Sequence, residues 1–301
     1  MTTNKPIRTD CPCCETSNLV PLRGYESSYL RRCKQCRFVY AAKVPTALEL
    51  EEHYAHKYDK KYVPDAWVSK TTRNRLAELI ASFSSYRDTN RLLDVGCGRG
   101  LLLEAAQDAG WGCFGTEYST DAISLGVDRG FTMHEGELRD DTFPHEHFDV
   151  IVMTEFIEHM PRPRDAMLTI SRLSRMGGLL YLTTPNFDSL SRRILRSKWN
   201  VIEYPAHLSY FGAETLTKLL ESCGLSLVKI QSTGFSPTRF KKSLLGQEHP
   251  TTASTDADER VRSALEASWQ ARLLKRAINR GLSMARLGDT LKVEFVKTKS
   301  V

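Results

Sequence analysis

The chain has 301 residues, 41% of them hydrophobic, which allows one large domain with a full core and a small additional unit. The formal net charge is +6, but residues 71–236 hold 17 basic against 21 acidic side chains. This acidic middle argues against a catalytic face that clamps a long nucleic acid, because such a face has a basic footprint.

The sequence also bears on compartment. It contains no run of about 18 apolar residues, and its first residues, "MTTNKPIRTD", lack the apolar stretch of a signal peptide. We therefore expect a soluble cytoplasmic protein.

Five of the eight cysteines fall within the first 36 residues. "CPCC" (11–14) and "CKQC" (33–36) form two C-x2-C pairs separated by 18 residues, with Cys13 left over. This spacing lets four thiolates surround one tetrahedral Zn²⁺, and four sulfurs leave no open position for catalysis. We predict a zinc ribbon over residues 1–45 with a structural metal, free cysteines being the alternative. The predicted ligands are Cys11, Cys14, Cys33 and Cys36.

Residues 46–90 are predicted to connect the ribbon to the main domain. Tyrosines and histidines alternate with charges between residues 48 and 67, and apolar residues then recur at helical spacing over 69–83. We interpret the aromatic residues as packing and surface positions. A segment that covers a cofactor cleft is the alternative.

From residue 91 the pattern alternates between strand and helix. Such alternation predicts a parallel sheet with helices on both faces and ligands at the carboxyl ends of the strands. The predicted strands are 91–95, 112–117, 131–134, 148–153, 178–184 and 225–231. The predicted helices are 100–109, 119–129, 163–175 and 213–222.

"LLDVGCGRG" (92–100) lies between the first of these strands and its helix. The glycines are spaced G-x-G-x-G, unlike the G-x-G-x-x-G of dinucleotide sites, and Asp94 would repel a pyrophosphate. Glu117 ends the next strand, where a carboxylate can accept both ribose hydroxyls of an adenosine. S-adenosylmethionine, which has an ammonium, a sulfonium and no phosphate, suits this combination.

These motifs, together with "GTEYS", "FDVIVMTEFIEHM" and "GGLLYLTTPN", resemble the class I, Rossmann-like S-adenosylmethionine-dependent methyltransferases, in their ubiquinone-biosynthesis-like branch. The resemblance covers about residues 91–235. It implies an α/β domain over 91–301 with a seven-stranded sheet. The last strand would be antiparallel, with "DTLKVEFVK" (289–297) as its candidate, after a helical insertion at 236–288.

The resemblance also implies a set of cofactor-binding residues. The three glycines would lie under the methionine part, Asp94 near its amino group, and Glu117 on the ribose. "GEL" (136–138) departs from the commoner Gly-Asp-Ala pattern at the adenine position. The implied residues are Asp94, Gly96, Gly98, Gly100, Glu117, Tyr118, Glu137, Leu138, Thr154, Glu155 and Phe156.

Two histidines are candidates for the catalytic base. Glu158 and His159 leave the strand at 148–153, and His207 precedes the helix at 213–222, so both segments can border the same crevice. A hydroxyl acceptor must lose its proton, and imidazole is suited to this at neutral pH. We predict His159 as the base, with His207 as its competitor and Glu158 orienting the imidazole or capping a helix.

The segment 185–211 resembles the substrate-proximal part of ribbon-bearing methyltransferases from polysaccharide and deoxysugar gene clusters. Arg192, Arg193, Arg196 and Lys198 would contact a diphosphate there, unless they form a solvated helix face. The sugar C-methyltransferases of that group have a large additional C-terminal domain that this chain lacks. We therefore expect O-methylation of a sugar or other small-molecule hydroxyl, including nucleotide- or lipid-linked glycans. The alternatives are an RNA methyltransferase and a non-catalytic S-adenosylmethionine-binding protein.

The insertion at 236–288 ends in a basic amphipathic pattern at 260–282. We expect this helix to pack on the domain. The alternatives are a lid, a homodimer contact, or a peripheral contact with an anionic membrane.

Overall fold

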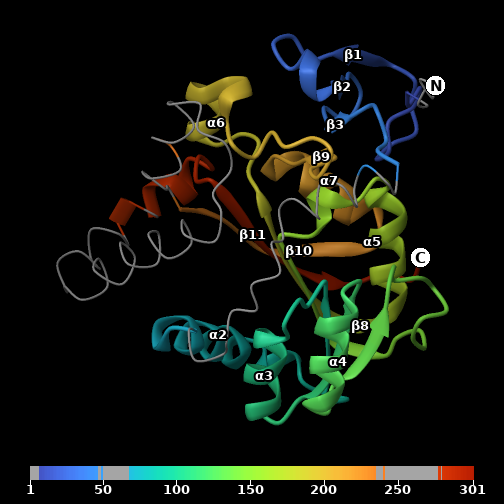
Figure 1. The fold of residues 1–301 in the computed structure, drawn as a ribbon, viewed down its shortest axis with the longest axis vertical. Helices are drawn as coiled ribbons and strands as arrows, with labels where there is room; N and C mark the ends of the chain where they lie inside the picture. Colours follow the sequence, from blue (N-terminus) through green and yellow to red (C-terminus); the bar gives the residue numbers. More distant parts are fainter. Residues whose placement is uncertain (1–6, 47–48, 50–67, 235–239, 241–276, 279) are drawn as a thin grey trace.

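The computed structural model describes residues 7–46, 49, 68–234, 240, 277–278 and 280–301. Within these ranges the chain builds a seven-stranded sheet with helices and a separate four-stranded sheet (Figure 1). Residues 47–48 and 50–67 of the predicted connector and 260–276 of the basic pattern lie outside the described residues, so the expectations for them stay predictions. None of the described helices is long and apolar enough to cross a membrane.

The seven-stranded sheet has the order β10-β11-β8-β7-β4-β5-β6. Neighbours from β8 to β6 pair in parallel, whereas β11 is antiparallel to both β8 and β10. The predicted Rossmann-like methyltransferase sheet with an antiparallel last strand is thus confirmed. Its strands are β4 (Arg91–Val95), β5 (Gly112–Glu117), β6 (Thr132–Glu135), β7 (Phe148–Thr154), β8 (Ser174–Pro185), β10 (Leu225–Thr233) and β11 (Thr290–Lys297).

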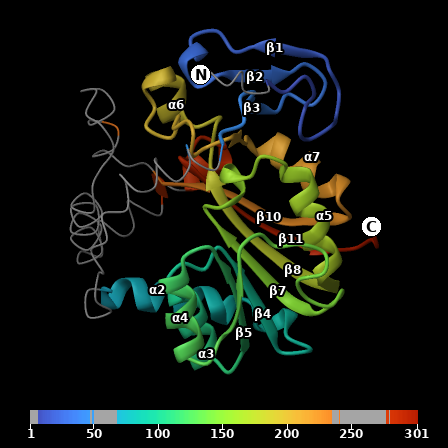
Figure 2. The ribbon, with the colours of Figure 1, turned by 45° about the vertical axis from the view of Figure 1, so that its right-hand side comes forward.

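Helices cover both faces of this sheet, with α2, α3 and α4 on one side and α5 and α7 on the other (Figure 2). Alternation along each strand produces the two faces, since Leu92 packs with α2 and α3 while Leu93 packs with α5 and α7. The helices are α2 (Lys70–Ser82), α3 (Leu101–Asp108), α4 (Thr120–Asp128), α5 (Pro163–Leu173) and α7 (Ala213–Ser222).

The largest difference from the predicted elements is at β8, which begins at Ser174 rather than at residue 178. The helix predicted for 163–175 correspondingly ends at Leu173. Ser174 pairs with Phe148, and a register shift follows between Phe148 and Val150. The two glycines of "SRMGG" (174–178) are typical of a turn. In the structure these residues belong to β8, and the register shift accommodates them.

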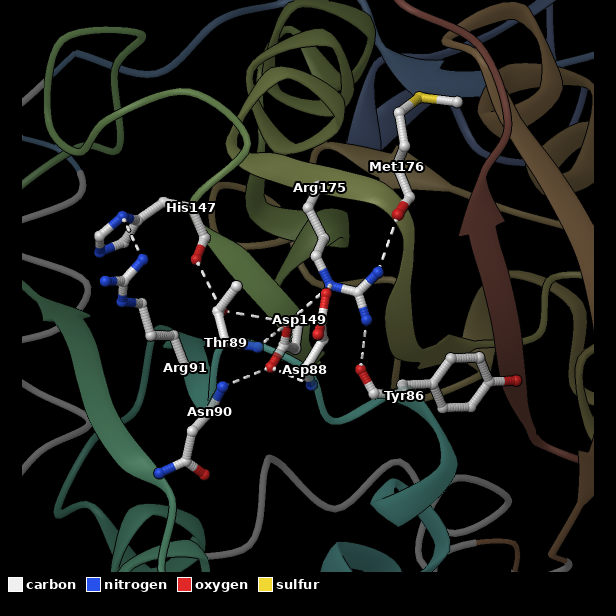
Figure 3. A network of polar contacts seen from close by, with 9 residues as sticks. All are labelled: Tyr86, Asp88, Thr89, Asn90, Arg91, His147, Asp149, Arg175 and Met176. Atoms are coloured by element: carbon white, nitrogen blue, oxygen red, sulfur yellow. Dashed lines mark hydrogen bonds and ion pairs between the residues drawn. The ribbon is translucent and has the colours of Figure 1, made fainter.

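The amino end of the sheet is fastened by a buried ion pair (Figure 3). The Asp149 carboxylate, at the start of β7, accepts hydrogen bonds from the amides of Asp88, Thr89 and Asn90 and lies 2.6 Å from Nε of Arg175. Burial alone would raise the pKa of Asp149, but these donors lower it to about 2. The network fixes the loop that leads into β4 at the end opposite the glycine loop.

The four-stranded sheet has the order β1-β2-β3-β9, and we call it the cysteine-rich sheet. Cys33 ends β2, while Cys11, Cys14 and Cys36 lie in the segments next to its strands. Its strands are β1 (Leu19–Pro21), β2 (Leu30–Cys33), β3 (Val39–Ala41) and β9 (Ser209–Tyr210). β9 comes from the segment before α7, so the cysteine-rich sheet takes its fourth strand from far along the chain. It pairs antiparallel with β3, with Tyr40 opposite Ser209.

Candidate functional site

The loop between β4 and α3 brings three glycines to the carboxyl end of the sheet. Gly96, Gly98 and Gly100 have φ values of 72°, 52° and 74°, which other residues rarely adopt. The amides of Gly96 and Cys97 donate to the carbonyl of Thr116 at 3.0 and 3.1 Å, which holds the loop against β5. A Cβ built at Gly98 would meet nothing within 4 Å, so this part of the loop faces open space.

Two carboxylates lie at this loop. Asp94 is buried in β4, and burial together with the nearby charge of Glu117 raises its pKa to about 7. Glu117, at the end of β5, accepts hydrogen bonds from the amides of Gly98 at 2.9 Å and Tyr118 at 2.7 Å. A buried carboxylate with a raised pKa favours a cationic neighbour, since a positive charge stabilises its ionised form. The electrostatics of the loop therefore suit a positively charged ligand.

The predicted adenine residues cluster beside Glu117. The Gly136 amide donates to the Glu117 carbonyl at 2.8 Å, which brings 136–138 beside the end of β5. Partial burial, with the carboxylates of Glu137 and Glu117, raises the pKa of Tyr118. Glu137 is exposed, whereas Leu138 packs against the core. Tyr118 itself is 61% exposed, so this edge is open to a ligand.

The predicted methionine-end residues follow β7. The Phe156 ring lies on Gly96, where a Cβ would collide with it, so glycine is needed at this position. The Glu155 amide donates to the Thr183 carbonyl at 3.0 Å, and Glu155 has a φ of 49°, an unusual value for a non-glycine residue. Phe156 thus lies against the glycine loop, while Glu155 is held by β8.

His159 and His207 lie together although 47 residues separate them. Their ring centroids are 4.7 Å apart at an interplanar angle of 72°. Nδ1 of His159 lies 3.0 Å from the Ala206 carbonyl, and Nδ1 of His207 lies 2.8 Å from the Val201 carbonyl. A carbonyl only accepts, so each Nδ1 carries the proton in the neutral ring and Nε2 carries the lone pair. Both histidines therefore have the tautomer that a base acting through Nε2 requires.

Glu158 is buried behind this pair. Its carboxylate accepts a hydrogen bond from the Thr184 hydroxyl at 3.1 Å, and burial with the nearby charge of Glu155 raises its pKa well above the usual value. One ligand atom from each of Glu158, His159 and His207 lies within 4.8 Å of the others, so the three side chains can also hold a metal ion.

A pocket opens beside Glu155, at the end of β8 and the start of β11. The buried Ser191 hydroxyl has no hydrogen-bond partner among the described residues, and the carbonyl of Val201 accepts the His207 hydrogen bond. No motif points to these residues, apart from their place after "TPN" (184–186). The described lining residues are Glu155, Pro185, Ser191, Leu195, Trp199, Asn200, Val201, Phe240, Asp289 and Thr290.

Of the four basic residues expected at a diphosphate, Arg192 is engaged within the protein. Its Nε donates to the Phe187 carbonyl, its guanidinium lies 4.3 Å from the centre of the Phe187 ring, and it pairs with Asp188 at 3.8 Å. These contacts form because Arg192 lies in the first turn of helix α6 (Leu190–Leu195), where its side chain reaches back over Phe187. Arg193, Arg196 and Lys198 are exposed.

The four predicted metal ligands converge in the cysteine-rich sheet. Sγ of Cys11 lies 3.6 Å from Sγ of Cys36, and Sγ of Cys14 lies 3.6 Å from Sγ of Cys33. All four sulfurs lie within 4.8 Å of one another, a group that can hold one metal ion. Cys13 is not part of this group.

Comparison with known proteins shows the family of this chain. The family described as "Methyltransferase domain" (Methyltransf_23) matches residues 68–230. A ubiquinone biosynthesis O-methyltransferase of Methylococcus capsulatus is 27% identical over 176 residues, covering 54% of this chain and 71% of that protein. The corresponding enzyme of Haemophilus ducreyi is 30% identical over 141 residues, covering 43% of this chain and 54% of that protein.

Solved structures share the fold. A SAM-dependent methyltransferase from Archaeoglobus fulgidus has a TM-score of 0.51 at 18% identity, covering 81% of this chain and 99% of that one. The [4+2]-cyclase SpnF has a TM-score of 0.53 at 17% identity, covering 84% and 97%. Because a cyclase also adopts this fold, the fold alone does not determine the activity, which the family match indicates. The chain belongs to the methyltransferase-domain family and is a class I, S-adenosylmethionine-dependent methyltransferase.

Proposed function

We propose that this enzyme methylates a hydroxyl group on a small, uncharged ring such as a sugar, either free or at the end of a nucleotide- or lipid-linked glycan. The observation that carries the proposal is the pair of imidazoles at the carboxyl end of the sheet, each with Nδ1 bound to a carbonyl. The relatives named as O-methyltransferases support the same reaction class.

S-adenosylmethionine supplies an electrophilic methyl group on a sulfonium. The cation-favouring Asp94 and the open space at Gly98 fit its charge and its need for close backbone approach. Glu117 would exchange its hydrogen bonds from the loop amides for the ribose hydroxyls. Tyr118, Glu137 and Leu138 would border the adenine, and 154–156 the methionine end.

His159 is the proposed base. It would accept the proton of the substrate hydroxyl at Nε2 while its Nδ1–H stays on the Ala206 carbonyl. That hydrogen bond orients the ring and stabilises the imidazolium that forms. His207, on the adjoining segment, would hold the acceptor oxygen beside it.

The pocket supports an uncharged acceptor. Its described lining contains two carboxylates, Glu155 and Asp289, and neither lysine nor arginine. Ser191 offers a buried hydroxyl for a substrate hydroxyl, because leaving it unpaired costs stability that a bound polar group recovers. A phosphate would be repelled here, so any diphosphate would lie outside the pocket.

The test is methyl transfer from labelled S-adenosylmethionine to matched acceptors that differ only in charge, such as a methyl glycoside and its phosphate ester. We expect the neutral member of each pair to react faster and the product to contain an O-methyl group by NMR. A C-methyl or N-methyl product, or a preference for the anion, would contradict the proposal.

A divalent cation is a second way to activate the hydroxyl at this site. It is favoured by one observation, the convergence of ligand atoms from Glu158, His159 and His207. The two arrangements differ in their response to added Mg²⁺ or Mn²⁺. A bare imidazole base predicts unchanged kcat, whereas a metal-assisted reaction predicts activity that saturates with the cation.

We also propose that Cys11, Cys14, Cys33 and Cys36 hold one structural zinc ion. Sulfur–sulfur distances of 3.6 Å are close to those expected around a tetrahedral ion with Zn–S bonds of about 2.3 Å. Elemental analysis of freshly purified protein tests this proposal, and one zinc per chain is the expected result.

The raised pKa of Asp94 predicts how cofactor binding depends on pH. Its pKa of about 7 means that the carboxylate ionises as pH rises toward 7, and the ionised form favours a cationic ligand. We expect the affinity for S-adenosylmethionine to rise about fivefold between pH 6 and pH 7, below the usual pKa of an α-amino group near 8. Calorimetry should show this rise in the wild type and a flat response in Asp94→Asn.

Rising pH has the opposite effect on the stability of the cofactor-free protein. A carboxyl whose pKa is raised by folding stabilises the cofactor-free protein at low pH, and this contribution is lost as pH rises through about 7. Asp94→Asn should therefore melt at a higher temperature than the wild type at pH 8, without cofactor. Equal pH profiles of both proteins in both measurements would contradict the assignment.

A further inference from the structure

The cysteine-rich sheet takes its fourth strand, β9, from the segment that contains His207. We infer that its metal holds β9 in place and thereby positions His207 beside His159, so that the zinc ribbon is a positioning device for the active site. The inference rests on the proposed roles of the two histidines and of the four cysteines. It concerns a segment, residues 206–211, that contacts the ribbon on one side and the site on the other.

The ribbon side of this segment is a strand pairing. Tyr40 lies opposite Ser209, and the Ala41 amide donates to the Leu208 carbonyl at 2.9 Å. The rings of Phe38 and Phe211 add an apolar contact, with centroids 4.9 Å apart. Because β9 has only two residues, it depends on β3 to remain a strand.

The site side of the same segment is bound to the residues after β7. The Leu208 amide donates to the Glu158 carbonyl at 2.8 Å, and the Ser209 hydroxyl donates to the Met160 carbonyl at 2.9 Å. The Ala206 carbonyl accepts the proton on Nδ1 of His159 at 3.0 Å. A shift of β9 would therefore displace His207 and also change the partner of the proposed base.

The metal connects to β9 through β2 and β3. Cys33 is the last residue of β2, and its amide donates to the Phe38 carbonyl at 2.9 Å, just before β3. Cys33 and Cys36 thus bracket the turn that sets β3. A unit of about 40 residues can hardly fold on its own core, so the metal supplies its stability. Without it, β3 would no longer provide a fixed edge for β9.

In both ribbon views the cysteine-rich sheet lies above one end of the large sheet (Figures 1 and 2), and Figure 1 shows β9 next to β3. The amides of Gly96 and Cys97 bind the Thr116 carbonyl and that of Gly98 binds the Glu117 carboxylate, so the glycine loop is held by β5 of the large sheet. The coupling should therefore reach the histidines and leave the cofactor loop unchanged, a division that a purely stabilising role would not produce.

The test uses Ala41→Pro in the full chain, which removes the hydrogen bond to Leu208 and leaves all four cysteines. We expect one zinc per chain and S-adenosylmethionine affinity within about twofold of wild type. The NMR signals of the His159 and His207 rings should shift, and kcat on an accepted substrate should fall by about tenfold to a hundredfold. Val20→Pro, which disturbs the opposite edge of the same sheet opposite Arg32, is the matched control and should leave the histidine signals in place.

Zinc removal by chelation provides a second measurement that does not depend on the proline variant folding. The histidine signals should shift in step with zinc loss while cofactor affinity is retained. Histidine signals and turnover that are unchanged in zinc-free protein would overturn the inference. If the signals shift but turnover is unaffected, the positioning stands and the proposed role of the histidines fails.

Discussion

His159→Ala is expected to lower kcat by about 10²- to 10⁴-fold, the usual contribution of a positioned general base. An alcohol does not ionise at neutral pH, so a reaction without the imidazole must rely on water. Affinity for S-adenosylmethionine should stay within about threefold, since the Ala206 carbonyl orients the ring and the proposed role of His159 is toward the acceptor rather than the cofactor. Steady-state turnover and calorimetric titration on the same preparation measure both quantities.

His207→Ala should behave differently, with its main effect on KM, because the proposed role of His207 is to hold the acceptor. His145→Ala is a matched control, since His145 is exposed near the amino end of β7, away from the site. Full activity in His159→Ala would end the proposal for that residue. A large loss of kcat confined to His207→Ala would transfer the role of base to His207.

Cys33→Ser is expected to have the largest effect on stability. Structural zinc sites contribute about 10–16 kcal/mol in isolated finger peptides, and Cys33 is fully buried at the end of β2. Loss of one thiolate should release the metal and unfold β1, β2 and β3. We expect zinc content to fall from one ion per chain to nearly none, with hydrogen exchange becoming fast over residues 7–46 and staying slow in β4 and β7.

Cys13→Ser is the matched control for that experiment. Cys13 lies in the same "CPCC" turn but outside the four-sulfur group, so its replacement should leave the zinc content unchanged. Equal loss of zinc from both variants would show that the cysteine assignment is wrong. Retention of zinc in Cys33→Ser would do the same.

The large sheet was predictable because short stretches of sequence specify each of its strands. Buried strands such as 148–153 are continuous apolar runs, and the glycines after Val95 mark the turn into α3 wherever the rest of the chain goes. The four-cysteine group followed equally from spacing. β9 could not be predicted, because a two-residue strand has no periodicity and its partner, β3, lies far away in the sequence.

The site was predictable to a similar extent. Sequence order placed His159 and His207 at one edge of the sheet, but their contact and their tautomers depend on the carbonyls of Ala206 and Val201, which no side-chain pattern encodes. Arg192 illustrates the converse. Its charge suggested a ligand contact, whereas its stacking on Phe187 follows from local backbone geometry. The pocket around Ser191 likewise forms from the end of β8, the start of β11 and the 191–201 segment.

The pairing of β3 with β9 also limits how parts of this protein can be exchanged with those of other methyltransferases. A recombination point between residues 46 and 208 would join a foreign ribbon to this β9, separating three strands from the fourth that completes their sheet. Such a hybrid would expose an unpaired strand edge, and exposed edges promote aggregation. Ribbons should therefore transfer successfully only together with the short segment around Ser209, so that the two stretches are inherited as one unit despite their distance along the chain.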